Sequence, residues 1–284
     1  AIPGMGGGTF HTRYEPELAG YGEDSDQYST LFNAYCRAMQ GHLRQRGWLD
    51  EAFVYWFDEP DPKDYGFVMN GFARLAAAAP LLTRMLTEQP EVELEGGPNL
   101  WCPVSYSFDQ ESARERSRQG ERFWWYLCTV PKAPYCTLFI DHPATELRVW
   151  LWQTWARGID GILVWATNYW TSNTAYPDGL QDPYSDTMSW SSEYSGARRP
   201  WGNGDGRFLY PPLEAVRGSK DTPVMDGPVE SIRWEMLRDG IEDYEYLAML
   251  RRLLELKGKR LSPSEAESYA RLLDVPDSVT RSLR

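Results

Sequence analysis

The chain is poor in the residues that bind transition metals. Its 284 residues include only three histidines and four cysteines. The cysteines are Cys36, Cys102, Cys128 and Cys136, and their spacing fits no zinc-site pattern. We therefore expect buried or free thiols, no bound metal and no cofactor.

Two further absences narrow the classes of partner. The 41 acidic residues outnumber the 29 basic ones, the net charge is −12, and no basic stripe is visible, which argues against a nucleic-acid partner. No apolar run approaches the roughly 20 residues that a membrane-spanning helix needs. We expect neither nucleic acid nor membrane as a partner. No signal peptide is recognisable, and the compartment stays open, with an extracytoplasmic one favoured.

Aromatic residues, by contrast, are abundant. The chain has 13 tryptophans and 17 tyrosines. Most such rings pack into a core, and the functional alternative is stacking on sugar rings or other flat ligands. Several of the rings follow the ends of expected strands, where a binding site would use them.

The most informative stretch is residues 53–60. The apolar run Phe-Val-Tyr-Trp-Phe ends abruptly in Asp58, Glu59 and Pro60. The run predicts a buried strand, and the proline cannot continue the ladder of hydrogen bonds. The two acids therefore lie at the carboxyl end of a strand, where α/β enzymes place their chemistry. Adjacent strand residues point to opposite sides, so one acid could protonate a leaving group while the other holds the substrate.

Segments with strand character alternate with helical ones along most of the chain. The expected strands are 9–14, 53–57, 82–87, 99–106, 122–128 and 161–167. The expected helices are 25–46, 63–79, 109–119, 142–157, 229–257 and 262–273. Asp141 is a candidate N-cap for the fourth helix, and a capping box begins the last helix at Ser262. Such alternation predicts a parallel α/β sheet.

A closed barrel needs eight strands, and the sequence offers six. We expect an α/β fold of the (β/α)8 TIM-barrel type, lacking the first two βα units and forming one domain over residues 1–284. An open six-stranded sheet is the alternative, although no phosphate-binding glycine loop accompanies it. Residues 171–228, rich in glycine, proline and serine, are expected to form a long active-site loop region, and residues 229–284 to form C-terminal helices.

Several motifs follow one another in a specific order. They are Tyr-Trp-Phe-Asp-Glu-Pro at 55–60, Trp-Trp-Tyr-Leu-Cys at 124–128, Asp-Gly-Ile-Leu-Val-Trp at 160–165, and further segments at 148–153, 204–206, 210–211, 231–235 and 238–247. In order and spacing they resemble the catalytic domain of glycoside hydrolase family 123, the β-N-acetylgalactosaminidases. The resemblance implies a (β/α)8 barrel with the Asp-Glu pair after its fourth strand. Here the pair follows the second strand, which agrees with two strands missing in front and with an N-terminally incomplete domain.

The resemblance also implies a mechanism. The expected strand 122–128 ends without an acid, which weakens the case for a protein nucleophile and suits a substrate-assisted route through an oxazoline-type intermediate. Glu59 would act first as general acid and then as base. Asp58 would accept the N–H of the substrate's 2-acetamido group. Tyr126 is the candidate to hydrogen-bond the acetamido oxygen.

Five further residues are candidates for substrate binding. Trp124, Trp165 and Trp170 could form walls around the sugar, and Asn168 and Asp205 could bind its hydroxyl groups. Core packing is the alternative for at least half of the tryptophans in these segments. A simple turn is the alternative for Asp205, which lies between two glycines.

Other functions stay open at this point. One is a two-carboxylate glycosidase acting on a sugar without the acetamido group, with Glu59 as acid and Glu88 as its partner. Another is a carbohydrate-binding protein without catalysis. Carbohydrate is the expected partner in each case, and a second chain that supplies the missing barrel strands is a further candidate partner. The choice between N-acetylgalactosamine and N-acetylglucosamine is not predicted from the residues.

A group of charged residues near the start of the long C-terminal helix has a structural interpretation. We expect these residues to form an ion-pair network instead of a site. They are Arg233, Glu235, Arg238, Asp239, Glu242 and Asp243.

Overall fold

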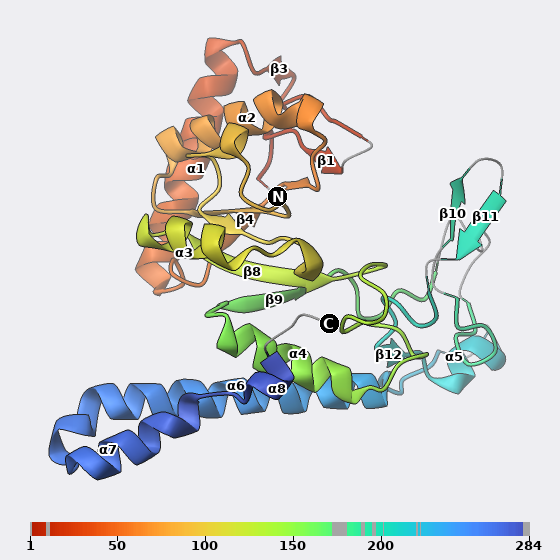
Figure 1. The fold of residues 1–284 in the computed structure, drawn as a ribbon. Helices are drawn as coiled ribbons and strands as arrows, with labels where there is room; N and C mark the ends of the chain where they lie inside the picture. Colours follow the sequence, from red (N-terminus) through yellow and green to blue (C-terminus); the bar gives the residue numbers. More distant parts are fainter. Residues whose placement is uncertain are drawn as a thin grey trace. The chain divides into compact units, whose positions relative to one another are not determined.

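A computed structural model describes residues 2–9, 12–171, 181–188, 191–194, 197–200, 202–219, 221 and 223–280 (Figure 1). The chain divides into two compact units, Ala1–Trp125 and Tyr126–Arg284. The boundary falls within one strand, β8.

The largest sheet has five strands in the order β4-β6-β7-β8-β9. These strands are β4 (Phe53–Tyr55), β6 (Thr83–Leu86), β7 (Leu100–Trp101), β8 (Arg122–Leu127) and β9 (Gly161–Val164). The first four pair in parallel. A separate parallel pair joins β1 (Gly8–Thr9) to β5 (Phe57–Asp58), which continues the chain of β4 after Trp56.

The prediction of a (β/α)8 TIM-barrel fold is wrong. In the described part of the chain the main sheet is five-stranded and mostly parallel, and β1 pairs only with β5. Barrel closure in this family of folds takes eight strands, because a shorter row of strands cannot curl far enough to meet itself around a packed interior. The parallel α/β character that the sequence predicted is confirmed, but the (β/α)8 TIM-barrel type is not.

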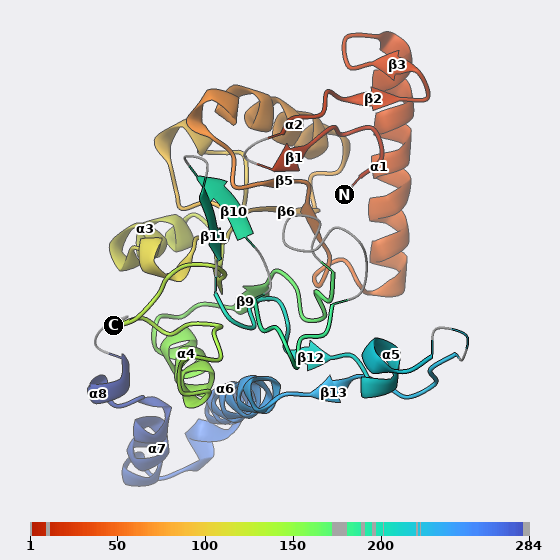
Figure 2. The same cartoon turned by 90° about the vertical axis from the view of Figure 1, so that its right-hand side faces the viewer.

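The helices of the first unit are α1 (Asp26–Arg46), α2 (Tyr65–Ala78) and α3 (Gln110–Arg118), with short 3₁₀ turns at Pro62–Asp64, Val92–Leu94 and Ser105–Ser107. Helix α1 begins at Ser25, whose side chain accepts the Tyr28 N–H, and ends at Gly47, which has a left-handed φ of 73°. Tyr28, Phe32 and Cys36 form its buried face. A small ribbon of β2 (Glu17–Leu18) and β3 (Tyr21–Gly22) lies against one end of α1 (Figure 2).

An aromatic cluster fixes the strand that carries the acid pair. The Trp56 ring packs edge-on against Phe57 and Phe72, with ring centroids 5.6 and 5.9 Å apart, and it also contacts Phe67. A Cβ atom added to Gly71 of α2 would lie 2.5 Å from the Trp56 ring. Helix α2 can therefore approach the strand closely only because position 71 has no side chain.

The second unit is dominated by α4 (Thr145–Ala156) and α6 (Ile232–Lys257), which lie side by side (Figure 1). Their contact is closest at Gly240, where an added Cβ atom would lie 3.0 Å from the Leu151 side chain. Shorter helices are α5 (Leu213–Arg217), α7 (Pro263–Ala270) and α8 (Asp277–Thr280), with 3₁₀ turns at Gly258–Arg260 and Arg271–Leu273. Helices α6 and α7 overlap the helices expected over 229–257 and 262–273.

The region expected as one long loop contains secondary structure of its own. Strands β10 (Ser191–Tyr194) and β11 (Ala197–Pro200) form an antiparallel pair, and β12 (Leu209–Tyr210) pairs with β13 (Val229–Glu230). Residues 172–180, 189, 190, 195, 196, 201, 220 and 222 of this region lie outside the described residues, as do residues 10 and 11 of the first expected strand.

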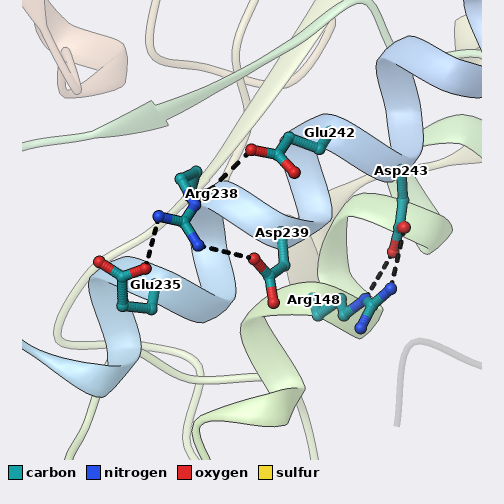
Figure 3. A network of polar contacts seen from close by, with 6 residues as sticks. All are labelled: Arg148, Glu235, Arg238, Asp239, Glu242 and Asp243. Carbon is teal, nitrogen blue, oxygen red and sulfur yellow. Dashed lines mark hydrogen bonds and ion pairs between the residues drawn. The ribbon is translucent and has the colours of Figure 1, made fainter.

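The predicted ion-pair network is present on α6 (Figure 3). Arg238 contacts Glu235, Asp239 and Glu242, at 2.7, 3.3 and 3.6 Å. Arg148 of α4 pairs with Asp243 at 2.6 Å and so joins the two helices. Exposed pairs of this kind contribute little to stability, about 0–1 kcal/mol each.

Arg233 does not belong to this network. Its buried guanidinium donates hydrogen bonds to the backbone carbonyls of Leu138, Gly204 and Arg207, at 2.5 to 2.8 Å. The sequence prediction was wrong for this residue because helical spacing does not show which side of α6 faces the core.

All four cysteines are free, as expected, and Cys36 and Cys102 are buried. No helix among the described residues is both long and apolar enough to cross a membrane.

Candidate active site

The acid pair lies where the sequence predicted it. Asp58 is the last residue of β5, and Glu59 follows it before Pro60. Both acids are half-buried. Glu59 has a φ of 43°, a left-handed backbone conformation that few residues other than glycine adopt. Such a turn costs on the order of 1 kcal/mol and is most often kept where function needs it.

Two hydroxyl groups hold the Asp58 carboxylate. The Thr87 hydroxyl donates to Asp58 Oδ1 at 2.9 Å, and the Tyr55 hydroxyl donates to the same oxygen. Within the described part of the chain no donor contacts Asp58 Oδ2. One carboxylate oxygen of Asp58 is therefore engaged by two protein hydroxyl groups.

Thr87 also contacts the second acid. The Glu59 backbone N–H donates to Thr87 Oγ1 at 2.9 Å. Thr87 follows β6, the neighbour of β4 in the sheet, and only 4% of its surface is exposed. The sequence analysis missed this residue, although it ends the expected strand 82–87 and directly precedes Glu88.

The Tyr55 hydroxyl stays protonated in this arrangement. Burial, followed by the charge of the neighbouring Asp58 carboxylate, raises the pKa of Tyr55 well above its ordinary value of 10. Tyr55 is therefore protonated near neutral pH and donates its hydrogen bond to Asp58.

Glu88 is the other acid near this cluster. Burial raises the pKa of Glu88 to about 7, and the nearby charges of Glu91 and Glu59 add to the rise. A hydrogen bond from the Gln89 backbone N–H, 3.2 Å from Glu88 Oε1, opposes it. A carboxyl group with such a pKa can exchange protons near neutral pH.

The glycine-rich segment near the N-terminus lies beside the acids. Gly7 and Gly8 have φ values of 128° and 137°. A Cβ atom on Gly7 would lie 2.5 Å from the Trp56 carbonyl oxygen, and one on Gly8 would collide with the Thr12 carbonyl. This close approach lets β1 pair with β5 and sets Thr9 opposite Asp58. The glycines thus serve backbone packing at the acid pair.

Strand β8 carries the two aromatic candidates Trp124 and Tyr126, with Trp125 between them. Trp125 is fully buried and packs edge-on against Phe108, with ring centroids 5.6 Å apart. Trp124 is half-buried and contacts Phe53 at 5.0 Å. Tyr126 is 4% exposed. Trp125 is therefore a core residue, and alternation places Trp124 and Tyr126 together on the opposite side of the strand.

The other predicted binding residues gather in the second unit. The Trp165 indole N–H donates to Asp205 Oδ1 at 2.9 Å. Asn168 is exposed and forms an antiparallel bridge with Arg207, and the Tyr169 backbone N–H donates to the Gly206 carbonyl at 2.9 Å. The segments 165–170 and 203–209 are thus held together, and they bring Trp165, Asn168 and Asp205 into one cluster.

Asp205 is fully buried in this cluster. Burial raises the pKa of Asp205 to about 6, and the Trp165 and Gly206 N–H groups and the charge of Arg233 oppose the rise. Its Oδ2 atom is buried and has no hydrogen-bond partner among the residues that the structure describes. The residue is thus more than the simple turn that the sequence left open.

The indole nitrogen of Trp170 has a structural role. Its indole N–H donates to the Leu209 carbonyl at 2.8 Å and so ties strand β12 to the end of segment 165–170. Its ring is half-buried. Only the ring face is therefore left for contact with a sugar.

Buried arginines support the same region and were not predicted as site residues. Arg207 is fully buried and donates to the carbonyls of Tyr169 and Asp186, at 2.8 and 3.1 Å, and to the Gln181 side chain.

No cluster of three or more potential metal ligands occurs among the residues that the structure describes.

Comparisons with known proteins show the family of this chain. The model of the glycoside hydrolase 123 catalytic domain matches residues 12–250. A solved structure of a family 123 glycoside hydrolase from Clostridium perfringens, described in terms of glycolipid glycan hydrolysis, is similar with a TM-score of 0.54 and 16% sequence identity. The similarity covers 90% of this chain but 40% of that one, so this chain spans about two-fifths of that protein's length. At this identity the likeness shows the fold alone.

No curated protein matches the sequence. The family model nevertheless spans well over half of the chain, including the acid pair and the cluster of the second unit. The resemblance seen in the sequence motifs is confirmed: this chain belongs to the glycoside hydrolase 123 family.

Proposed function

We propose that the chain carries the catalytic acids of a glycosidase that removes terminal β-linked N-acetylgalactosamine by a substrate-assisted, retaining mechanism. The observation that carries the proposal is the acid pair at the end of β5. Asp58 is fixed through one oxygen by two hydroxyl donors and keeps the other oxygen for substrate. Membership of the glycoside hydrolase 123 family supports a glycosidic bond as the target.

The proposed reaction has two steps. Glu59 protonates the glycosidic oxygen while the carbonyl oxygen of the substrate's 2-acetamido group attacks the anomeric carbon, and the leaving group departs. Asp58 Oδ2 accepts the acetamido N–H and stabilises the positive charge of the oxazoline-type intermediate. Glu59 then takes a proton from a water molecule, which attacks the anomeric carbon and opens the oxazoline ring. Because the anomeric carbon is attacked twice, its configuration is retained.

The remaining candidates have supporting roles in this proposal. Tyr126 donates a hydrogen bond to the acetamido oxygen and orients it for attack. Trp124 is the candidate for sugar contact in the first unit, and Trp165, Asn168 and the ring face of Trp170 are the candidates in the second. Asp205 has no exposed surface and positions Trp165 by accepting the hydrogen bond of its indole N–H. We expect Tyr126→Phe to lower kcat for an aryl β-N-acetylgalactosaminide by about 10-fold or more, because the hydrogen bond that orients the acetamido oxygen for attack is lost.

The proposal is tested by the rates of single variants on an aryl β-N-acetylgalactosaminide. Asp58→Ala should lower kcat by on the order of 100-fold or more, because the developing charge loses its partner. Glu59→Gln should lower the rate for poor leaving groups by about 100-fold or more and much less for a dinitrophenyl leaving group, which needs no proton. Full activity of either variant on a poor leaving group would contradict the assignment.

The two-carboxylate alternative has one observation in its favour. Glu88 lies close enough to Glu59 for their charges to interact, and its pKa is raised to about 7. If Glu88 were the nucleophile or base, Glu88→Gln would abolish activity, and a sugar with a free 2-hydroxyl would be cleaved at a comparable rate. Substrate assistance predicts that Glu88→Gln keeps most of the activity.

A further inference from the structure

One buried hydroxyl group contacts both members of the acid pair. Thr87 Oγ1 donates to Asp58 Oδ1 and accepts from the Glu59 backbone N–H, each at 2.9 Å. A hydroxyl has one proton to donate and two lone pairs to accept with, so it can make both bonds at once. The Tyr55 hydroxyl oxygen lies 3.4 Å from Thr87 Oγ1. No other residue type of this size carries both a donor and an acceptor in one rigid, branched side chain.

Each of the two bonds fixes a different feature of the pair. The bond to Asp58 sets the orientation of its carboxylate, because Oδ1 is occupied by Thr87 and Tyr55. The bond from Glu59 holds a backbone that turns through a φ of 43°. That turn places the side chain of Glu59 relative to Asp58. Since Thr87 directly follows the neighbouring strand β6, the end of that strand fixes the position of both acids.

We propose that Thr87 is a positioning residue for the reaction, which acts on Asp58 and Glu59 together, and that Tyr55 is a second positioning residue, which acts on Asp58 alone. Neither residue touches the reacting atoms. The inference extends the proposed function, and it depends on that function only for the kinetic part of its test.

The two residues have different kinetic signatures. Thr87→Val keeps the shape of the side chain and removes the hydroxyl, so both acids lose a hydrogen bond. We expect kcat for an aryl β-N-acetylgalactosaminide to fall on the order of 10- to 100-fold with KM changed less than threefold, because a hydrogen bond to a charged group is lost while substrate contacts remain. The loss should be larger for poor leaving groups, because Glu59 is also misplaced. Tyr55→Phe should lower kcat equally for good and poor leaving groups.

A readout that needs no activity tests the contact itself. The backbone amide of Glu59 should be protected from hydrogen exchange in the native protein. In Thr87→Val this amide should exchange about 5- to 10-fold faster or more, because it has lost its hydrogen bond to the Thr87 hydroxyl. Thr87→Ser restores the hydroxyl and should recover most of both properties. Thr83 is a half-buried threonine at the start of β6 with no described side-chain hydrogen bond, so Thr83→Val serves as the control for the threonine-to-valine change itself.

The outcomes separate the two proposals. Faster exchange at Glu59 together with a lower kcat in Thr87→Val, both recovered in Thr87→Ser, supports the positioning role. Unchanged exchange at Glu59 overturns it, and so does faster exchange with an unchanged kcat. If the wild-type protein cleaves no N-acetylgalactosaminide but cleaves a sugar without the acetamido group, the proposed substrate is wrong. The role of Thr87 is then judged by the same variants on that sugar.

Discussion

Single residues in the second unit show how burial changes the chemistry of a side chain. Asp205 was predicted only as a hydroxyl ligand or a turn residue. In the structure it has no exposed surface, and one of its oxygens accepts from Trp165. The second oxygen has no hydrogen-bond partner within the described ranges of the chain. Burial therefore raises its pKa to about 6. Sequence position between two glycines gives no sign of this, because burial depends on segments far apart in the chain.

The raised pKa predicts a pH dependence of stability. The folded protein binds a proton at Asp205 more tightly than the unfolded chain does, where the pKa is about 3.9. This contribution to stability is complete below the unfolded pKa and is lost as the pH rises through 6. Asp205→Asn removes it, so the variant's stability relative to wild type should improve by about 2–3 kcal/mol between pH 4 and pH 8.

Urea unfolding of both proteins at pH 4 and pH 8 measures this difference. Comparing the two proteins at each pH cancels the titration of all other groups. A difference between wild type and Asp205→Asn that is the same at both pH values would show that Asp205 titrates normally in the folded protein.

At the scale of elements, packing between helix and strand explains where glycine is required. Gly71 of α2 lies against the Trp56 ring, and an added Cβ atom would lie 2.5 Å from it. Gly66 belongs to the same helix, and an added Cβ atom there would meet nothing within 4 Å. The two positions therefore separate helix propensity from steric fit.

We expect opposite effects at the two glycines. Gly66→Ala should stabilise the protein by about 0.5–1 kcal/mol, because alanine is the better helix former. Gly71→Ala should destabilise it by about 1–3 kcal/mol, because the methyl group displaces the Trp56 ring or α2. Thermal or denaturant unfolding of the two variants tests this, and a stabilised Gly71→Ala protein would mean that α2 does not pack as described. Because Trp56 precedes the acid pair by two residues, Gly71→Ala should also lower activity.

The elements themselves were largely predictable from local pattern. Helices α1, α3, α6 and α7 begin and end within a few residues of the predicted bounds, and the capping box at Ser262 is present. The N-cap predicted at Asp141 was wrong. Helix α4 begins at Thr145, and Asp141 instead accepts a hydrogen bond from the Asn203 side chain at 3.0 Å. A residue 62 positions away in the chain outcompeted the local cap, which no local pattern could show.

For the whole molecule, the acid pair was predictable and the closure of the sheet was not. Asp58 and Glu59 were identified because an apolar run and a proline set their position by local rules. Whether strands close into a barrel depends on which distant strands pair and on the number available. Counting apolar segments therefore predicted parallel α/β structure correctly but the barrel type wrongly. Thr87 was missed for a similar reason, since its role appears only once β6 lies beside β4.

The chain belongs to the glycoside hydrolase 123 family over residues 12–250, and it spans about two-fifths of the length of its structural relative from Clostridium perfringens.

The measurement that tests the central proposal most directly uses two matched substrates. They are nitrophenyl β-galactosides that carry either a 2-acetamido group or a 2-hydroxyl group and are otherwise identical. We predict that the protein cleaves the acetamido substrate at least about 100-fold faster in kcat/KM, because only that substrate supplies its own nucleophile. The first product should be the β-anomer. Equal rates on the two substrates, or an α-anomer as first product, would contradict a substrate-assisted retaining mechanism.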